Sequence, residues 1–554
     1  IQTHWDTVGH EDQWTTTTLL EIRTLAQHPW PLSGGSSSGV LNGINSIDRK
    51  LRDQVATIGF SCITGDDEFL VAPPSLAKRL AAPAVPFVLG EDVRDYTCLP
   101  SHTTLVPTDL DGNQLSPGKA LFRHLWRGRT VLSERLYFGK RPGERKMRWY
   151  DYAIFFPERF DSLRIAFAFV ATHFHPYLDN SKQVFKQSAP IMVLKPGSSL
   201  EDHLEIIAAL GSSVACFWLK QNSYPKSGDP EEWATRYEFT GTTLMDFPLA
   251  TALPWQRAQK LSSLATALAA EGLGSLTADA TTTPLLLETE ENQRQIRARM
   301  IAHQDELDWE VYASYRLLEE ALVYDAEPPE VQLGERAFEI ALARRIAAGG
   351  ESTAWFERHG STPITDIPHH WPNDYRELVQ RRIDAIESVD AIRLLEAPEY
   401  KRRWAAEPFE KQADRALRSW LLDRLEDRSL WFTSQGQVRP QSVSQLADTL
   451  GRDPEFRSIV DLWQGRRDTD LEAALTTLVE TEAVPYLAAL RLKETGLRKF
   501  ADWQHTWDLQ RREDAGEAVG AIPVPPKYGS GDFLKPSYWQ ARGKLDVPKE
   551  RFIL

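Results

Sequence analysis

Two patterns of hydrophobic and polar residues divide the chain. Between residues 56 and 253, short runs of β-branched and aromatic residues, such as AIFF and LRIAFAFV, are separated by polar turns, which is typical of core strands. From residue 254 to about residue 512, apolar residues recur at helical spacing, for example at Leu261, Leu264 and Leu268. The pattern therefore predicts an α+β fold: a mixed α/β domain, then a mainly α-helical domain, then an extended tail.

These changes of pattern predict four segments. They are a helical connector with a Gly/Ser linker (1–55), a mixed α/β domain (56–253), an α-helical domain (254–520) and a Pro-rich basic tail (521–554). Within the connector, apolar spacing predicts a helix in residues 1–30, and Pro, Gly and Ser at 28–39 predict the linker. A short helix is expected over 44–55.

Several helices can be assigned individually. Residues 199–223 predict one helix capped by Ser198 or Ser199, and 285–327 contain neither Gly nor Pro, which predicts one long helical arm. Further helices are expected over 375–395, 409–425, 442–450 and 471–495. The KRRW stretch from Lys401 to Trp404 is expected on a helix surface. In the tail, Phe533, Tyr538 and Trp539 are expected to anchor the chain to the protein.

Composition narrows the class of protein. The chain has 554 residues, 42% of them hydrophobic, and a formal net charge of −14. This size predicts two or three domains, and no apolar run approaches the roughly 20 residues that span a bilayer. Cys62, Cys98 and Cys216 are scattered singly, which fits a reducing cytoplasm. The acidic balance excludes a protein that coats nucleic acid over its whole surface but allows a local basic groove.

A basic strip stands out against this acidic background. Residues 123–152 carry nine Arg and Lys against two Glu, with aromatic residues among them. Arg and Lys neutralise phosphates, Arg can also read guanine, and aromatic rings can stack on an unpaired base. The strip and the strands after it supply the candidate DNA-binding residues: Arg123, Arg127, Arg129, Arg135, Lys140, Arg141, Arg145, Lys146, Arg148, Trp149, Tyr150, His173, His175, Lys182 and Lys186. The alternative is a solvated surface arm above buried aromatic residues.

The sequence contains no recognisable catalytic or metal site. A glycine-rich loop for S-adenosylmethionine and a [DNS]PP[YFW] motif are both absent, and so are hydrolase, metalloprotease, P-loop and kinase motifs. His173 and His175 face the same side of a predicted strand but have no carboxylate or cysteine partner nearby in the sequence. No metal is therefore predicted, and the catalytic set is empty.

Several segments resemble one protein family. The segments GFSCITGDDEFLVAP, WYDYAIFF, VATHFHPYLDNSKQVFKQSAPIMVLKPG, LGSSVACFWLKQ, RYEFTGTTLMDFPL and PPKYGSGDFLKPSYWQARGKLDVPKERFI together resemble PglX. PglX proteins are the adenine-specific DNA methyltransferases of bacteriophage exclusion (BREX) systems, and the type 2 branch is the most similar. Related recognition domains occur in type IIG restriction–modification enzymes and in DISARM methylases, which remain alternatives.

The resemblance implies a function for each segment. In the family, a methyltransferase domain that uses S-adenosylmethionine precedes a target-recognition domain and a helical region. We therefore expect this chain to be a C-terminal part without a cofactor of its own, in which residues 56–253 read duplex DNA in bacterial anti-phage defence. The helical region would clamp DNA or bind other BREX proteins. The alternative is that the whole chain is chiefly a protein-interaction scaffold.

Overall fold

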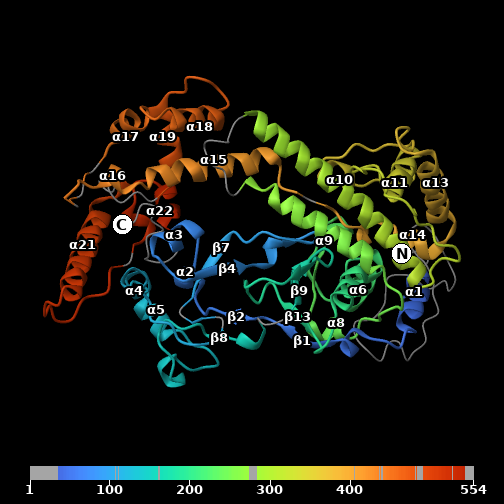
Figure 1. The fold of residues 1–554 in the computed structure, drawn as a ribbon, viewed down its shortest axis with the longest axis horizontal. Helices are drawn as coiled ribbons and strands as arrows, with labels where there is room; N and C mark the ends of the chain where they lie inside the picture. Colours follow the sequence, from blue (N-terminus) through green and yellow to red (C-terminus); the bar gives the residue numbers. More distant parts are fainter. Residues whose placement is uncertain are drawn as a thin grey trace, which may run out of the picture.

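The computed structural model describes residues 35–542, except residues 107, 110, 160–162, 274–282, 405, 436, 438, 440, 481, 483–490 and 527. The helix expected in residues 1–30 lies outside the described residues. In Figure 1 the strands occupy the centre of the molecule, long helices lie at the right, and the C-terminal helices lie at the left. The predicted α+β class is confirmed.

Two four-stranded sheets form the β-rich part. The first has the order β1-β13-β9-β11 and is antiparallel throughout. The second has the order β12-β4-β7-β3, in which only the β12–β4 pair is parallel. The strands are β1 (Val55–Gly59), β13 (Ile191–Leu194), β9 (Arg164–Phe167), β11 (Pro176–Asp179), β12 (Val184–Phe185), β4 (Ala84–Val88), β7 (His102–Leu105) and β3 (Val71–Ala72).

Smaller sheets and short helices complete this part. The sheet β10-β15-β14 and the pairs β2–β8 and β5–β6 are antiparallel. Their strands are β10 (Val170–Ala171), β15 (Arg236–Glu238), β14 (Pro225–Ser227), β2 (Cys62–Ile63), β8 (Ile154–Phe155), β5 (Val93–Arg94) and β6 (Thr97–Cys98), and the short helices are α2 (Asp67–Leu70), α3 (Pro74–Arg79), α4 (Lys119–Trp126), α5 (Arg129–Glu134) and α8 (Gly241–Met245).

The remaining helices from α9 to α21 lie within the predicted helical region, and α22 lies in the segment predicted as a tail. Helices α9 and α10 lie side by side along the sheets (Figure 1). The helices are α9 (Trp255–Ala270), α10 (Thr283–Ser314), α11 (Ala337–Ala347), α12 (Trp355–Arg358), α13 (Asn373–Ser388), α14 (Asp390–Leu395), α15 (Phe409–Leu425), α16 (Arg428–Trp431), α17 (Val443–Leu450), α18 (Pro454–Gln464), α19 (Leu471–Glu480), α21 (Glu494–Asp514) and α22 (Pro536–Arg542).

One hydrophobic core continues across residue 253. A single buried cluster includes Phe167 of β9, Ile207 of the helix after β13, Leu261 of α9 and Trp309 of α10, and it extends to Trp404. Burial of this contiguous apolar surface is the main term that stabilises the arrangement. A second cluster joins α15 to α19, and a third lies under α2, α4 and α5. The domain boundary at residue 253 stays a prediction, and the core on its two sides is shared.

Three sequence assignments, two near the N-terminus and one in the centre, were wrong. Residues Gly35–Asn45 form helix α1, which packs against α14, although 35–39 were expected to belong to a linker. Of the helix expected over 44–55, only the last two residues of α1 and a short 3-10 turn at Leu51–Asp53 are present before β1. The helix expected over 199–223 is broken into α6 (Leu200–Leu210) and α7 (Ser213–Asn222). The predicted cap is confirmed, because the Ser199 hydroxyl accepts a hydrogen bond from the Asp202 backbone N–H.

The long helical arm is shorter than its sequence suggests. Helix α10 ends at Ser314, although 285–327 carry no Gly or Pro. Arg316 adopts a left-handed conformation (φ 57°), and the Leu317 N–H bonds to the Tyr312 carbonyl, as in a helix-terminating Schellman turn. Glycine normally signals such a turn, and its absence hid the helix end.

The KRRW stretch is also placed differently from expectation. Lys401 and Arg402 are only 2% and 4% exposed and lie outside any helix. Lys401 pairs with Asp308 and Glu396, while Arg402 pairs with Asp95. The expected helix surface is therefore a buried ionic contact between the helical region and the strands.

The C-terminal segment packs back onto the protein, as expected. Phe533 pairs with Leu492 and lies in a small core with Trp503 and Tyr528. The Trp539 ring lies 5.6 Å from that of Phe533. In the described ranges, no single helix is long and apolar enough to cross a membrane; α6 and α7 pass that test only as a pair, and they are bent by 68°.

Candidate nucleic-acid interface

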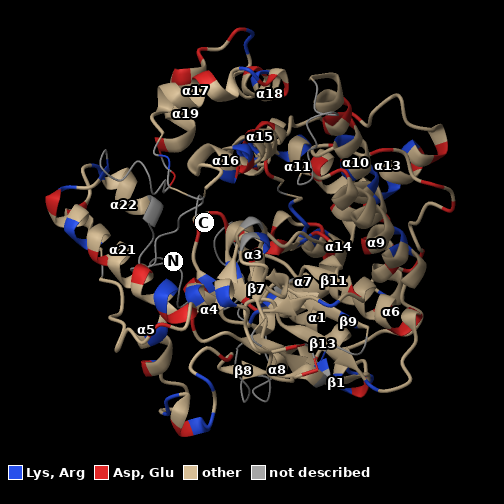
Figure 2. Ribbon diagram, turned by 60° about the vertical axis from the view of Figure 1, so that its left-hand side comes forward, with Lys and Arg blue, Asp and Glu red and all other residues tan. Residues whose placement is uncertain are grey.

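Helices α4 and α5 and the segment after them carry the basic strip. The chain turns sharply between the two helices at Gly128, where a Cβ atom would lie 2.5 Å from the Phe69 ring. Only glycine allows α5 to approach α2 this closely. The segment after α5, residues 135–152, extends to the lower edge of the molecule in both Figure 1 and Figure 2. We call residues 135–152 the basic arm.

Four cations of the predicted strip are exposed on α5 and the basic arm. They are Arg129, Lys140, Arg141 and Lys146. Arg141 forms a surface ion pair with Glu134, with a 2.8 Å separation and both side chains more than half exposed. Such a pair contributes little stability in water, so its guanidinium remains available to an anion. Lys182, in the β11–β12 connection, is also exposed. Figure 2 shows the Lys and Arg positions along α4, α5 and the arm in blue.

Three other predicted cations hold the arm in place. Arg135 donates to the backbone carbonyls of Thr64 and Asp151, and Arg145 donates to the Ala153 carbonyl at 2.9 Å. Arg148 donates to Asp151 Oδ1 at 2.9 Å and to the Leu115 carbonyl at 2.6 Å. These hydrogen bonds fix an irregular segment that has little secondary structure of its own. The three guanidinium groups are thus engaged by the protein itself.

Helix α21 packs against the remaining cations of the strip. Arg123 of α4 forms an ion pair with Asp514, and the Arg127 guanidinium lies 5.7 Å from the centre of the Trp503 ring. Lys186, a predicted cation outside the strip, instead forms an ion pair with Asp67 of α2 and is partly buried. The Trp126 and Trp507 rings are 6.0 Å apart, which adds an apolar contact between α4 and α21. The structure therefore divides the strip into an exposed group on the arm and a group that contacts the rest of the chain.

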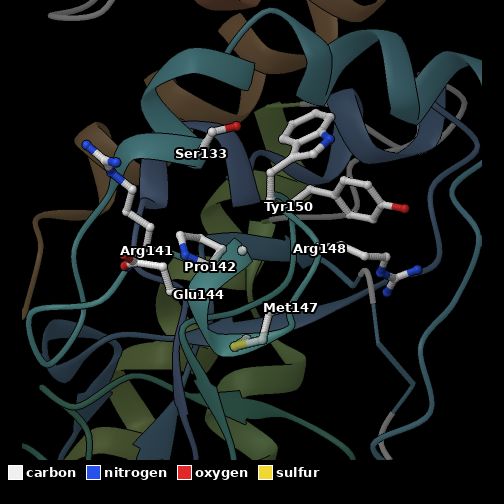
Figure 3. Close-up of a pocket in the computed structure, with 9 residues that line it drawn as sticks. Ser133, Arg141, Pro142, Glu144, Met147, Arg148 and Tyr150 are labelled. Carbon is white, nitrogen blue, oxygen red and sulfur yellow. The ribbon is translucent and has the colours of Figure 1, made fainter.

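An open pocket lies beside the exposed cations. It has a volume of about 550 Å³ and is lined by Ser133, Arg141, Pro142, Gly143, Glu144, Met147, Arg148, Trp149 and Tyr150. Figure 3 shows Arg141 and Glu144 on one side, Tyr150 and Arg148 on the other, and Met147 below. The Trp149 and Tyr150 rings meet edge-on at 4.9 Å, and both contact Phe122 of α4. Both rings remain partly exposed, and aromatic faces of this kind can stack on a nucleobase.

His173 and His175 lie away from this surface, in the protein interior. They are 6% and 4% exposed, and their rings are 4.2 Å apart. Burial lowers the pKa of His175 to about 4 and that of His173 well below its usual value. Both rings are therefore neutral near pH 7. In this position they support the fold, and they are not part of the exposed cation group.

The histidines have a carboxylate partner that sequence spacing did not show. Asp95 comes from the β5–β6 turn, and its carboxylate lies 3.3 Å from His175 Nδ1 and 3.8 Å from His173 Nε2. The three residues could hold a metal ion by distance alone. However, the Arg402 guanidinium lies 3.0 Å from Asp95 and 3.2 Å from His175 Nδ1, so a cation of the chain already neutralises the carboxylate. The absence of a metal stays a prediction, and this geometry favours it.

Two exposed apolar residues in the arm escaped the sequence analysis. The side chains of Leu136 and Phe138 are 66% and 83% exposed. Both residues lie among the cations of the arm. The pattern of hydrophobic residues in the sequence does not show that their side chains are exposed. The only local signal is the Phe138–Gly139 pair between two polar or charged neighbours, which is compatible with a tight turn.

Comparison with known proteins shows a curated protein to which the chain is similar. It is similar to an adenine-specific methyltransferase over 99% of its length, with 43% identity across 582 aligned residues. That relative is PglX of Streptomyces coelicolor (strain ATCC BAA-471 / A3(2) / M145), of which the chain covers 48%. The predicted resemblance to PglX is thereby confirmed and is consistent with a C-terminal portion of such a protein. The chain spans about half the length of this curated relative.

Two further comparisons are more limited. A family described as a domain of unknown function (DUF7008) matches residues 300–554. Among solved structures, the type IIL restriction–modification enzyme MmeI in complex with DNA aligns with 51% of this chain and 35% of its own, at 11% identity and a TM-score of 0.29. The last similarity is too distant to assign a function to any residue.

Proposed function

We propose that this chain recognises double-stranded DNA as part of a PglX-like adenine-specific methyltransferase. Residues 56–253 form the recognition unit in this proposal, and the basic arm contacts the duplex. The observation that carries it is the exposed group of Arg129, Lys140, Arg141 and Lys146 on a chain whose net charge is −14. A local group of exposed cations on an otherwise acidic chain is a surface suited to a polyanion.

The engaged arginines refine the assignment of roles. We propose that Lys140, Arg141 and Lys146 neutralise phosphates and that Arg129 reaches a base or a phosphate from the start of α5. Arg135, Arg145 and Arg148 act by holding the arm in its shape. Phosphate contacts of this kind position a protein on the duplex without reading its sequence. The Trp149–Tyr150 pocket is the proposed place for a base or sugar edge.

The chemistry of methyl transfer falls to residues outside this sequence. The relative's name describes a methyltransferase, and the chain covers 48% of that protein. We propose that S-adenosylmethionine binds in that other part, and that the complete protein modifies adenine in a bacterial BREX defence system. Helices α9–α19 would then support the recognition unit or contact other BREX proteins.

A salt titration of DNA binding tests the proposal. Fluorescence anisotropy with a 30-base-pair duplex measures Kd between 50 and 300 mM KCl. In the triple variant Lys140→Ala/Arg141→Ala/Lys146→Ala, the slope of log Kd against log salt concentration should be smaller by about 2.7, because each phosphate contact contributes about 0.9. Near 0.1 M salt its affinity should fall on the order of 100-fold.

The matched control removes the same amount of charge elsewhere. Arg381 and Arg393 are 53% exposed on α13 and α14, and Arg467 is exposed after α18. Replacing these three by Ala should leave the slope within about 0.5 of wild type. Equal slopes for the two triple variants would refute the arm as the contact surface. A chain that binds no duplex but retains a protein partner would instead support the scaffold alternative.

A further inference from the structure

The basic arm contains a tight turn over residues 137–140, with an aromatic residue at its first central position. The Tyr137 N–H bonds to the Lys140 carbonyl at 3.0 Å, and the Lys140 N–H bonds back to Tyr137 at 3.2 Å. The two central residues, Phe138 and Gly139, have φ values of 51° and 72°. Positive φ at both positions is the signature of a type I′ turn, which favours Asn, Asp or Gly at the first central position.

Phenylalanine is a costly choice at this position for two independent reasons. A bulky residue with positive φ is a backbone outlier, because its Cβ approaches the neighbouring carbonyl. The ring is also 83% exposed, which makes it the most exposed large hydrophobic side chain in the described part of the protein. Backbone strain of this kind tends to persist where a functional site requires it. Turn chemistry does not account for this residue, and its only ring contact in the described part of the chain is with Tyr137.

Contacts with neighbouring residues of the arm hold the Phe138 ring in place. The ring lies edge-on to Tyr137 with its centre 4.6 Å away, and the Arg145 guanidinium lies 5.6 Å from the Tyr137 ring centre. Arg145 is in turn bonded to the Ala153 carbonyl at 2.9 Å. A chain of contacts therefore leads from the body of the protein to the tip. This arrangement reduces the entropy lost when the ring enters a confined site.

The surroundings of the ring indicate what it meets. Lys140 and Arg141 follow it after Gly139, Lys146 lies further along the arm, and Leu136, two residues before it, is 66% exposed. A protein partner would commonly offer an apolar pocket with a neutral or mixed rim. An apolar tip flanked by cations instead matches proteins that insert a side chain between base steps while cations hold the adjacent phosphates.

We propose that Phe138 inserts between adjacent base pairs of the DNA and partly unstacks them. This inference rests on the proposed DNA-binding function and adds a mechanism to it. Lys140, Arg141 and Lys146 bind the DNA backbone on either side of the base step, and the turn places the ring between the two base pairs. Unstacking of this kind lowers the barrier to extruding a neighbouring base, which enzymes acting on a base require.

Comparison of two duplexes tests the insertion. One is an intact 30-base-pair duplex, and the other carries a central C·C mismatch that is already weakly stacked. A wedge prefers the mismatched duplex because part of the unstacking cost is already met there. Wild-type protein should bind it on the order of 10-fold more tightly than the intact duplex. In Phe138→Asn this preference should fall to about 1, while the salt slope on intact DNA stays unchanged.

The choice of variants separates folding from insertion. Asn suits a left-handed position followed by Gly, so Phe138→Asn should keep or raise the melting temperature. Phe138→Trp retains a flat ring and should retain the preference. Leu287→Ala is the control, because Leu287 is 62% exposed on α10, away from the arm in sequence.

The outcomes distinguish this inference from the function on which it rests. Salt-dependent binding without any preference for the mismatched duplex overturns the wedge and leaves the proposed function standing. An equal preference in wild type and in Phe138→Asn also overturns the wedge. Absence of duplex binding under all salt conditions refutes both. The wedge is supported only when the preference is present, is lost in Phe138→Asn and is retained in Phe138→Trp and Leu287→Ala.

Discussion

Replacing Arg402 by Met should destabilise the shared core more than any surface substitution. The Arg402 guanidinium donates to Asp95 Oδ1 at 3.0 Å, to Gln304 Oε1 at 3.1 Å and to the carbonyls of Phe174 and Gly211 at 3.0 and 3.1 Å. These partners belong to the β5–β6 turn, to α10, to the connection between β10 and β11 and to the end of α6. One buried side chain therefore joins the strands to the helical region.

The expected magnitude follows from what remains after the substitution. Met fills most of the volume, but the Asp95 carboxylate loses its buried counter-charge, and three other acceptors lose a donor. Removing one partner of a buried pair typically costs about 3–5 kcal/mol. The core that contains these residues extends from Val40 to Trp404, about 365 residues. With about 2.1 cal/mol/K of unfolding entropy per residue, its total is about 0.8 kcal/mol/K, so a loss of about 4 kcal/mol lowers Tm by about 5 °C.

Differential scanning calorimetry measures this shift, with Arg393→Met as the matched control. Arg393 is 53% exposed and pairs with Asp390 on the surface, so its loss should cost less than about 1 kcal/mol. Adding Asp95→Asn to Arg402→Met removes the unpaired charge and should recover at least about 1 kcal/mol. A Tm for Arg402→Met within 1 °C of the control would refute the argument. Lack of recovery in the double variant would show that packing, and not charge, accounts for any loss.

Two further predictions concern pH and packing. Because the pKa of His175 falls from its usual 6.5 to about 4 on folding, the unfolded chain binds more protons between these values, and stability should fall as pH drops below 6.5. The loss from His175 is about 2 kcal/mol at pH 5, and urea unfolding at pH 7 and pH 5 should show a smaller difference in His175→Gln. Gly128→Ala would place a Cβ 2.5 Å from Phe69 and should cost about 1–3 kcal/mol, whereas Gly139→Ala, where no atom lies within 4 Å of the added Cβ, tests the positive-φ penalty alone. Urea midpoints that match wild type in Gly128→Ala would contradict the close approach of α5 to α2.

Periodicity predicted those elements whose own sequence determines them. Helix α15 has the bounds expected from its apolar spacing, and Ser199 caps α6 as its capping box indicates. The errors share a different cause. Arg316 ends α10 in a left-handed turn without glycine, and Gly35–Asn45 is helical despite its Gly and Ser content, since its apolar residues pack into the core. Tertiary contacts override local preference at both places.

The charge pattern located the candidate interface but did not show which of its cations are exposed and which contact the rest of the protein. All nine cations of residues 123–148 carry the same formal charge, yet Arg123 and Arg127 contact α21, which begins more than 350 residues later in the chain. Arg135, Arg145 and Arg148 differ from Lys140 and Lys146 only because carbonyls and Asp151 lie within their reach. Similarly, Asp95 joins His173 and His175 through folding alone, and its sequence neighbours give no hint of it.

Under the proposed function, the division of the strip would let an exposed arm engage DNA precisely. A loop of lysines alone would bind phosphates at many angles and would pay the full entropy of its own ordering on each encounter. Here Arg135, Arg145 and Arg148 use their hydrogen bonds to fix the backbone, while the exposed cations beside them remain available. If this is correct, Arg145→Met should weaken duplex binding although Arg145 touches no phosphate. Its effect should appear as loss of the mismatch preference with little change in salt slope, since the tip loses its support while the charges of Lys140 and Lys146 remain.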